Sequence, residues 1–300
     1  MIDFAHLVFL EVAKELNFSK AAEKLYLSQP SVSKHIKNLE GLYSVALFER
    51  KTNGISLTEE GKVLFEYLIK AQQLRQELQF DISTLRHQAD AKGSLVVGAS
   101  TTVALYLMPR IFSSFRHSFP HIRLQLINRN SENILKALLN HEVDVGIVEG
   151  KNKLTSVSYQ FWLRDKVVAV CAAHSPLAKK TTLTLHELTS LPIALREKGS
   201  GTLAVVADAL SQHGISFHQL NIQAIIGGTE ALKNFILENG CLALLPYLSV
   251  QKQLKNGELV QINLDGLDVH RDFYIVQRQG EENNKLTRIF VKHCLKDINF

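Results

Sequence analysis

One stretch of the sequence, from Gln29 to Leu39, combines hydrogen-bonding and basic side chains and contains no acidic residue. In a helix, its polar residues at i, i+3, i+4 and i+7 share one face, and these are Pro30, Ser33, Lys34 and Lys37. The opposite face is apolar and would be buried, with Val32, Ile36 and Leu39. Glutamine and serine bond to base edges, and lysine reaches guanine or phosphate, so the stretch predicts contacts with DNA.

Further DNA contacts are expected around this helix. Ser31 lies in its first turn, between Pro30 and the apolar face. Arg50 and Lys51 would lie on a small β-wing and contact the DNA backbone or the minor groove, and Lys20 would meet a phosphate near a helix start. The competing interpretation is that these are solvated polar side chains, and it has more weight for Lys20 and Lys51 than for the helix.

Hydroxyl-bearing residues follow predicted strands in the second half of the chain, at points where helices begin. They are Ser100, Thr101 and Thr102, then Ser131, and then Gly199, Ser200, Gly201 and Thr202. Such turns offer hydroxyls, backbone N–H groups and the positive end of a helix dipole, which suits a small anion or carboxylate. Gly228 is expected to close the other side of this pocket. Plain helix capping is the alternative for each Ser and Thr. Arg129 and Arg196 either add charge or form surface ion pairs.

Three short helices and a hairpin are predicted to position the DNA-contacting residues. The helices span 4–14, 20–25 and 29–39, with Ser19 and Ser28 as the N-caps of the second and third. Pro30 stands in a first turn, where its missing N–H costs nothing. Asn53-Gly54 between two short apolar runs predicts the hairpin. Together these elements indicate a winged helix-turn-helix.

A long helix is predicted to follow, capped by Thr58. Its apolar residues alternate in steps of three and four and are Leu64, Leu68, Ala71, Leu74, Leu78, Ile82 and Leu85. This spacing favours a helix that pairs with another helix. A helix lying on the core of its own domain remains the alternative.

Beyond residue 89 strands and helices alternate, which predicts mostly parallel sheets with ligands beyond the carboxyl ends of the strands. The predicted strands are 95–100, 123–129, 143–149, 166–172, 192–196, 221–226, 241–245, 259–264 and 273–278. The predicted helices are 103–117, 132–140, 202–213, 229–238 and 282–296. The fold class is therefore α/β after an N-terminal helical domain.

Composition limits the possible classes. The chain has 300 residues, 46% of them hydrophobic, which predicts two or more globular domains. The three cysteines, Cys171, Cys241 and Cys294, are widely spaced, which argues against a disulfide framework or a zinc site and suits a reducing cytoplasm. No apolar run is long enough for a membrane span. Residues 1–58 carry 7 Lys and Arg against 6 Asp and Glu, so DNA affinity is expected to depend on dimerisation.

Residues 7–61 resemble the winged helix-turn-helix of LysR-type transcriptional regulators. The matching segments are Phe18–Leu25, Ser28–Ser33, Ile36, Leu39–Glu40, Leu47–Arg50 and Leu57–Gly61. Looser matches continue through the chain at Leu107–Pro109, Asp144–Ile147 and Arg196–Thr202. The family usually has Leu and Gly where Tyr43 and Ser44 stand. Members with this glycine-rich loop often have Arg in place of Leu203, and the missing charge favours a small or singly charged effector.

The resemblance implies a sequence-specific regulator of transcription in the cytoplasm, with neither enzymatic activity nor a cofactor. It implies a winged helix-turn-helix over 1–58, a linker and dimerisation helix over 59–88, and a two-lobed periplasmic-binding-protein-like effector domain over 89–300. One lobe covers about 89–162 and 267–300, and the other about 163–266. The implied partners are double-stranded DNA, a small effector, and further copies of the chain in a dimer and a tetramer. RNA polymerase is a further candidate partner.

Two other classes of protein share some of these features. A solute-binding transport protein would share the two-lobed domain but would need a signal peptide and would lack a winged helix. A metabolic enzyme would need a catalytic constellation, and the sequence contains no G-x-S-x-G, H-E-x-x-H or P-loop motif. The sequence therefore favours a regulator that acts by binding.

Overall fold

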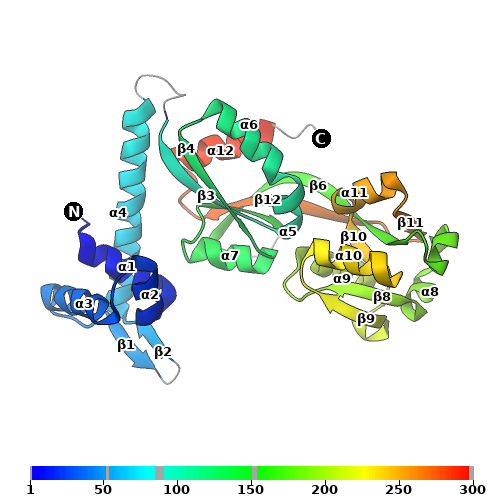
Figure 1. Ribbon diagram of the computed structural model, residues 1–300, viewed down its shortest axis with the longest axis horizontal. Helices are drawn as coiled ribbons and strands as arrows, with labels where there is room; N and C mark the ends of the chain where they lie inside the picture. Colours follow the sequence, from blue (N-terminus) through cyan, green and yellow to red (C-terminus); the bar gives the residue numbers. More distant parts are fainter. Residues whose placement is uncertain (1, 52–53, 85–90, 151–153, 297–300) are drawn as a thin grey trace. The chain divides into compact units, whose positions relative to one another are not determined.

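The computed structural model describes residues 2–51, 54–84, 91–150 and 154–296 (Figure 1). The chain divides into two compact units, Met1–Leu85 and Arg86–Phe300. The expected domain boundary at residue 89 lies outside the described residues. None of the helices in the described ranges is long and apolar enough to cross a membrane. Each unit has its own buried apolar core.

Three helices form the core of the N-terminal unit: α1 (Phe4–Glu15), α2 (Phe18–Leu25) and α3 (Gln29–Tyr43). A side chain caps each of them, and the caps are Asp3, Asn17 and Ser28. The prediction that Ser19 caps α2 was wrong, because the helix begins earlier and the Asn17 carboxamide accepts the Lys20 N–H at 3.0 Å. The predicted apolar face of α3 is buried in the shared core, with Val32, Ile36 and Leu39.

The end of α3 carries two of the three departures from the LysR pattern, Tyr43 and Ser44. Ser44 has a φ of 56°, in the left-handed region that glycine adopts with least strain. Its N–H still donates to the Glu40 carbonyl, so the turn is kept with serine in place of glycine. The Tyr43 hydroxyl lies 3.0 Å from His6 Nε2 and connects the end of α3 to α1.

The wing consists of β1 (Phe48–Lys51) and β2 (Gly54–Leu57), paired antiparallel as the hairpin signal predicted. Residues 52–53 at its tip lie outside the described residues. Thr58 follows the wing, and its Oγ1 accepts the Gly61 N–H at 3.0 Å and donates to the Ala46 carbonyl at 2.7 Å. The backbone at Gly61 touches the Leu47 carbonyl so closely that a Cβ would collide with it. This contact leaves no room for a side chain between the helix and the residue before the wing.

The long helix, α4 (Glu59–Thr84), has an apolar stripe in two parts. Leu68 is buried in the core of the N-terminal unit, and Leu64 packs against that core. Leu74, Leu78 and Ile82 are 67%, 58% and 60% exposed. Leu85, the last residue of the predicted stripe, lies outside the described residues. The first turns of α4 therefore belong to their own domain, whereas the later turns present apolar side chains to solvent.

Ten strands of the described chain form one sheet through the second unit (Figure 1). We call its two parallel halves the first and second lobe. The first lobe contains β3 (Gly93–Ala99), β4 (Ile122–Asn128) and β5 (Val145–Glu149), and the second β8 (Pro192–Arg196), β9 (Asn221–Ile226) and β10 (Leu242–Pro246). Between them lie the crossing strands β6 (Val157–Ala172) and β12 (Val269–Arg278), and β11 (Leu259–Leu264) and β7 (Thr182–Leu183) extend from β6.

The expectation of a mostly parallel sheet holds inside each lobe and fails at its centre. The crossing strands run antiparallel to each other and to β5 and β10. The strand predicted to begin at Lys166 begins at Val157, because the segment from Val157 to Asp165 pairs with β12. These long strands join the two lobes twice.

Helices pack on the sheet in both lobes (Figure 1). The first lobe carries α5 (Thr101–Tyr106), α6 (Met108–Ser118), α7 (Ser131–Leu139) and α12 (Lys285–Lys296), and the second α8 (Leu185–Ser190), α9 (Gly201–Gln212), α10 (Thr229–Asn239) and α11 (Tyr247–Asn256). The single helix predicted over 103–117 is two helices, because Pro109 stands in the first turn of α6 and cannot continue α5. The sequence reading also missed α8 and α11.

Candidate functional site

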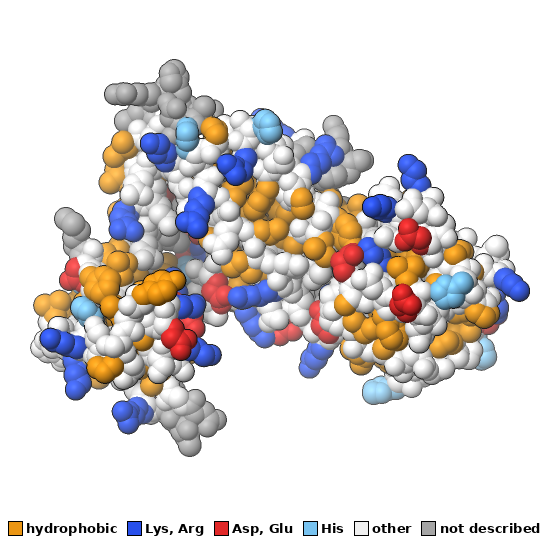
Figure 2. Space-filling view, in the orientation of Figure 1, with side chains coloured by type: hydrophobic (Ala, Val, Ile, Leu, Met, Phe, Trp, Pro, Cys, Tyr) orange, Lys and Arg blue, Asp and Glu red, His pale blue; other side chains and the backbone are white. Residues whose placement is uncertain are grey.

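The polar face of α3 lies at the surface of the N-terminal unit as predicted. Gln29, Pro30, Lys34 and Lys37 are exposed, and Ser31 and Ser33 are half-buried. Gln29 Nε2 donates to Ser33 Oγ at 3.0 Å, so the two side chains most suited to base edges form a pair. Figure 2 shows Lys and Arg side chains on the surface of this unit.

The expected contacts with the DNA backbone come from elements beside α3. Lys20 is exposed in the first turn of α2, and Arg50 is exposed on β1. The backbone of Lys51 ends β1, and its side chain lies outside the description. The described basic side chains thus occupy the helix start and wing at which phosphate contacts were expected.

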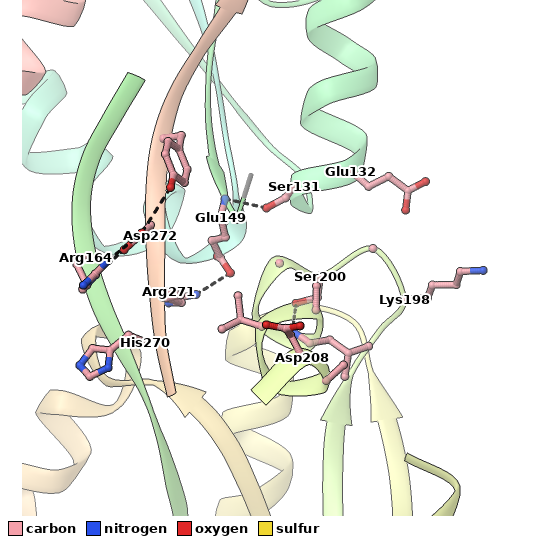
Figure 3. Close-up of a pocket in the computed structure, with 18 of the residues that line it drawn as sticks. Ser131, Glu132, Glu149, Arg164, Lys198, Ser200, Asp208, His270, Arg271 and Asp272 are labelled. Carbon is pink, nitrogen blue, oxygen red and sulfur yellow. Dashed lines mark hydrogen bonds and ion pairs between the residues drawn. The ribbon is translucent and has the colours of Figure 1, made fainter. Parts of the chain in front are cut away.

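A cleft of about 770 Å³ lies between the two lobes (Figure 3). The first lobe lines it with Ser131 and Glu132, and the second with the loop from Lys198 to Gly201. The crossing strands add Arg164, His270, Arg271 and Asp272. Four of the predicted effector residues line the cleft, and they are Ser131, Gly199, Ser200 and Gly201.

The Glu149 carboxylate, at the end of β5, lies where the predicted hydroxyls converge. Ser100 Oγ of the first lobe donates to Glu149 Oε1 at 3.2 Å, and Thr202 Oγ1 of the second lobe donates to Oε2 at 2.8 Å. The Glu149 N–H donates to Ser131 Oγ at 3.1 Å (Figure 3). The backbone at Gly201 is so close that a Cβ there would collide with the Cβ of Glu149. The Glu149 carboxylate therefore accepts hydrogen bonds from two hydroxyls, Ser100 and Thr202, that the sequence analysis assigned to a ligand.

A buried guanidinium completes this cluster. Arg271 Nη1 on β12 lies 2.7 Å from Glu149 Oε2 and donates to Thr202 Oγ1 at 2.9 Å. Its Nη2 donates to Asp165 Oδ2 on β6 at 2.8 Å. Burial raises the pKa of the Asp165 carboxyl, and the nearby Arg271 charge opposes this rise. The cluster sets two buried carboxylates against one buried guanidinium.

The remaining predicted effector residues, Thr101, Thr102 and Gly228, are not among the residues that line this cleft. Thr102 is fully buried, and its hydroxyl finds no hydrogen-bond partner within the described chain. Thr101 begins α5 and is half-buried. Gly228 precedes α10 and donates its N–H to Glu197 Oε2 at 3.2 Å. An unpartnered buried hydroxyl is costly, and the contact of Thr102 with an effector stays a prediction.

Arg129 and Arg196, whose roles the sequence left open, have different surroundings. Arg129 forms an exposed ion pair with Glu142 at 2.8 Å. Arg196 is buried, forms an ion pair with Glu197 at 2.8 Å, and donates from Nη1 to Thr229 Oγ1 at 2.6 Å at the start of α10. A further bond joins the lobes, since Lys233 Nζ of α10 donates to the Tyr106 hydroxyl of α5 at 3.3 Å.

The sequence reading missed three central residues: Glu149, Asp165 and Arg271. Glu149 ends an otherwise apolar strand, and that signal was available in the sequence. Asp165 and Arg271 face each other in the β6–β12 register, which only the sheet topology reveals. Long-range strand pairing therefore decides the charged part of the site.

Comparison with known protein families shows to which family this combination of domains belongs. Residues 6–62 match the family described as "Bacterial regulatory helix-turn-helix protein, lysR family", and residues 88–298 match the "LysR substrate binding domain". The chain belongs to the LysR family. This LysR-family protein is a DNA-binding regulator of transcription with an effector-binding domain, as its motifs predicted.

Individual proteins resemble this LysR-family regulator along its length. A probable RuBisCO transcriptional regulator of Guillardia theta is 30% identical over 95% of this chain and 92% of its own. The CcmR regulatory domain of Synechocystis, solved in complex with 2-PG, is 25% identical, covers 68% of this chain and 97% of its own, and has a TM-score of 0.62. Full-length CbnR, solved with its target DNA, is 19% identical, covers 98% of this chain and 99% of its own, and has a TM-score of 0.64.

Replacing Arg271 by Met should destabilise the effector-binding domain of the regulator by about 3–5 kcal/mol at neutral pH, because two buried carboxylates lose their cation. A carboxyl whose pKa is raised on folding contributes stability below its unfolded pKa and loses it as pH rises. The loss should therefore be smaller near about pH 5 than at neutral pH. Urea unfolding at both pH values measures it.

The matched control is Arg164→Met on the other crossing strand. Arg164 bonds Asp272 at 2.6 Å, but its side chain is 63% exposed. Solvent screens this pair, so the variant should unfold close to the wild type at both pH values. Equal losses in the two variants would contradict the assignment of Arg271 as the cation that stabilises the core.

Proposed function

We propose that this regulator reads a specific DNA sequence through α3 and that a small anion bound between its lobes changes that binding. It acts in the cytoplasm and by binding rather than by catalysis. The observation that carries the effector proposal is the convergence of Ser100 and Thr202, from opposite lobes, on one carboxylate. Donors arranged around a carboxylate are suited to an anionic ligand.

Several groups of the inter-lobe site support an anion as the effector. The first turn of α9 brings N–H groups and a positive dipole end to the cleft through Gly201. Lys198 lines the same cleft and carries a positive charge. The CcmR regulatory domain, which resembles this chain, was solved with 2-PG. We therefore propose a small carboxylate or phosphate ester as the effector class.

An effector changes DNA binding only if it prefers one arrangement of the protein over another. The crossing strands join the lobes, and the site spans both, so lobe positions and ligand contacts depend on each other. A tenfold preference per site corresponds to about 1.4 kcal/mol, and linked sites in an oligomer add such preferences. We propose this linkage as the regulatory switch.

Self-association is part of the proposal. The later turns of α4 expose Leu74, Leu78 and Ile82 on one stripe, and an exposed apolar stripe of this spacing fits a partner helix. We propose a dimer through α4 and a tetramer through further contacts of the effector-binding domains. RNA polymerase remains a candidate partner of the DNA-bound form.

The α3 face can be tested in DNA binding. Gln29→Ala or Ser33→Ala should abolish the preference for the target sequence, because the paired side chains that reach base edges are lost. Lys51→Ala should weaken binding to all sequences and lower the salt slope by up to about one unit. Footprinting and salt titration measure both effects. Gln76→Ala, an exposed glutamine of α4, is the control, and wild-type footprints from the Gln29 and Ser33 variants would refute the assignment.

The α4 stripe can be tested by oligomeric mass. The double variant Leu74→Asp, Leu78→Asp should make the free energy of dimerisation less favourable by several kcal/mol, because each chain would bury two charges in an apolar seam. Light scattering of the full chain reads the mass, and Gln76→Asp on the opposite side of α4 should leave it unchanged. An unchanged mass in the double variant would mean that α4 does not form the interface.

The effector site can be tested at Thr102. Thr102→Val keeps the shape of the side chain and removes the buried hydroxyl, so affinity for the anion should fall about 10- to 100-fold. DNA binding without ligand should stay intact. Calorimetry with a panel of small carboxylates and phosphate esters, 2-PG included, gives the affinities, and Thr182→Val on β7 is the control. Equal affinity in wild type and Thr102→Val would remove Thr102 from the site.

A further inference from the structure

The donors proposed for the effector are already occupied in this structure. Ser100 and Thr202 both donate to the Glu149 carboxylate, and Arg271 Nη1 lies 2.7 Å from it. The Glu149 side chain is 3% exposed, so water does not compete for these bonds. Glu149 itself is thus a carboxylate bound by two hydroxyls and a guanidinium.

A second anion cannot share these donors with Glu149. Each hydroxyl has one hydrogen to donate, and Ser100 and Thr202 give theirs to Glu149. Two anions side by side would also repel each other strongly in a buried site, where screening is weak. The cluster already holds Asp165 against the same guanidinium, so no cationic group of the cluster is left to neutralise a third negative charge.

Glu149 also ties the lobes to each other. It belongs to the first lobe, whereas Thr202 lies in the first turn of α9 in the second lobe. The Thr202–Glu149 bond of 2.8 Å is thus a direct connection across the cleft. Whatever displaces the carboxylate breaks this connection.

We propose that Glu149 is an internal competitor of the effector: its carboxylate occupies the hydroxyl donors, and an anion binds by displacing it and releasing the Thr202 bond between the lobes. This inference rests on the proposed function and adds to it. It sets the threshold concentration of effector, because the free energy of the Glu149 contacts is subtracted from ligand binding. It also names the bond whose loss couples binding to lobe movement.

The test compares Glu149→Gln with wild type in the full-length protein. The amide keeps the size of the side chain, and Arg271 stays paired with Asp165, so the variant is expected to fold. Calorimetry with inorganic phosphate and with 2-PG, at one pH and ionic strength, gives the affinities. Glu149→Gln should bind at least one of these anions about 10-fold more tightly than wild type, because an amide competes less well than a carboxylate for charged donors.

The matched control is Glu132→Gln, which removes one negative charge from the same cleft. Its side chain is 49% exposed and bonds Lys136 rather than the hydroxyls. It should change anion affinity less than about threefold, since solvent screens its charge. This comparison separates occupation of the donors from a general effect of charge.

Each outcome has a distinct meaning. A tenfold gain in Glu149→Gln with little change in Glu132→Gln supports the inference. Equal affinities in wild type and Glu149→Gln, or equal gains in both variants, overturn it and leave the anionic effector standing. A loss of affinity in Glu149→Gln overturns it too, because Glu149 would then contact the ligand. Binding to none of the proteins would overturn the anionic effector class and the inference together.

Discussion

One buried guanidinium connects four elements of the inter-lobe site, β5, β6, β12 and α9. Arg271 stands opposite Asp165 in the β6–β12 register, and its other contacts reach Glu149 on β5 and Thr202 on α9. Buried charges are stable only when paired and hydrogen-bonded, so these four positions must be kept in one geometry. The same group fixes the two crossing strands, the last residue of β5 and the first turn of α9.

The parts of this molecule that the sequence predicts well are those whose signals are local. The periodicity of α3 and its Ser28 cap predict both its buried and its polar face, because a helix brings together residues three and four apart. The hydroxyl turns are visible for the same reason, since each follows a strand and begins a helix. Family motifs at fixed spacing then give the order of the domains.

What the sequence did not predict depends on contacts between distant segments. Nothing near Asp165 or Arg271 shows that they pair, because their proximity comes from the long antiparallel crossing strands. The first half of β6 was missed because a register shift opposite Phe273 and Tyr274 breaks the regular alternation of exposed and buried side chains. At Ser19 the local signal was ambiguous: two capping residues stand close together, and the helix begins after Asn17, the earlier one.

The contact between Gly61 and the Leu47 carbonyl has a mechanical consequence. With Thr58 also bonded to the Ala46 carbonyl, the start of α4 and the segment that enters the wing form one rigid piece. A rotation of α4 about its own axis would therefore move β1 and β2 with it. In the dimer that we propose through α4, a change in the angle between the two helices would therefore change the distance between the two wings.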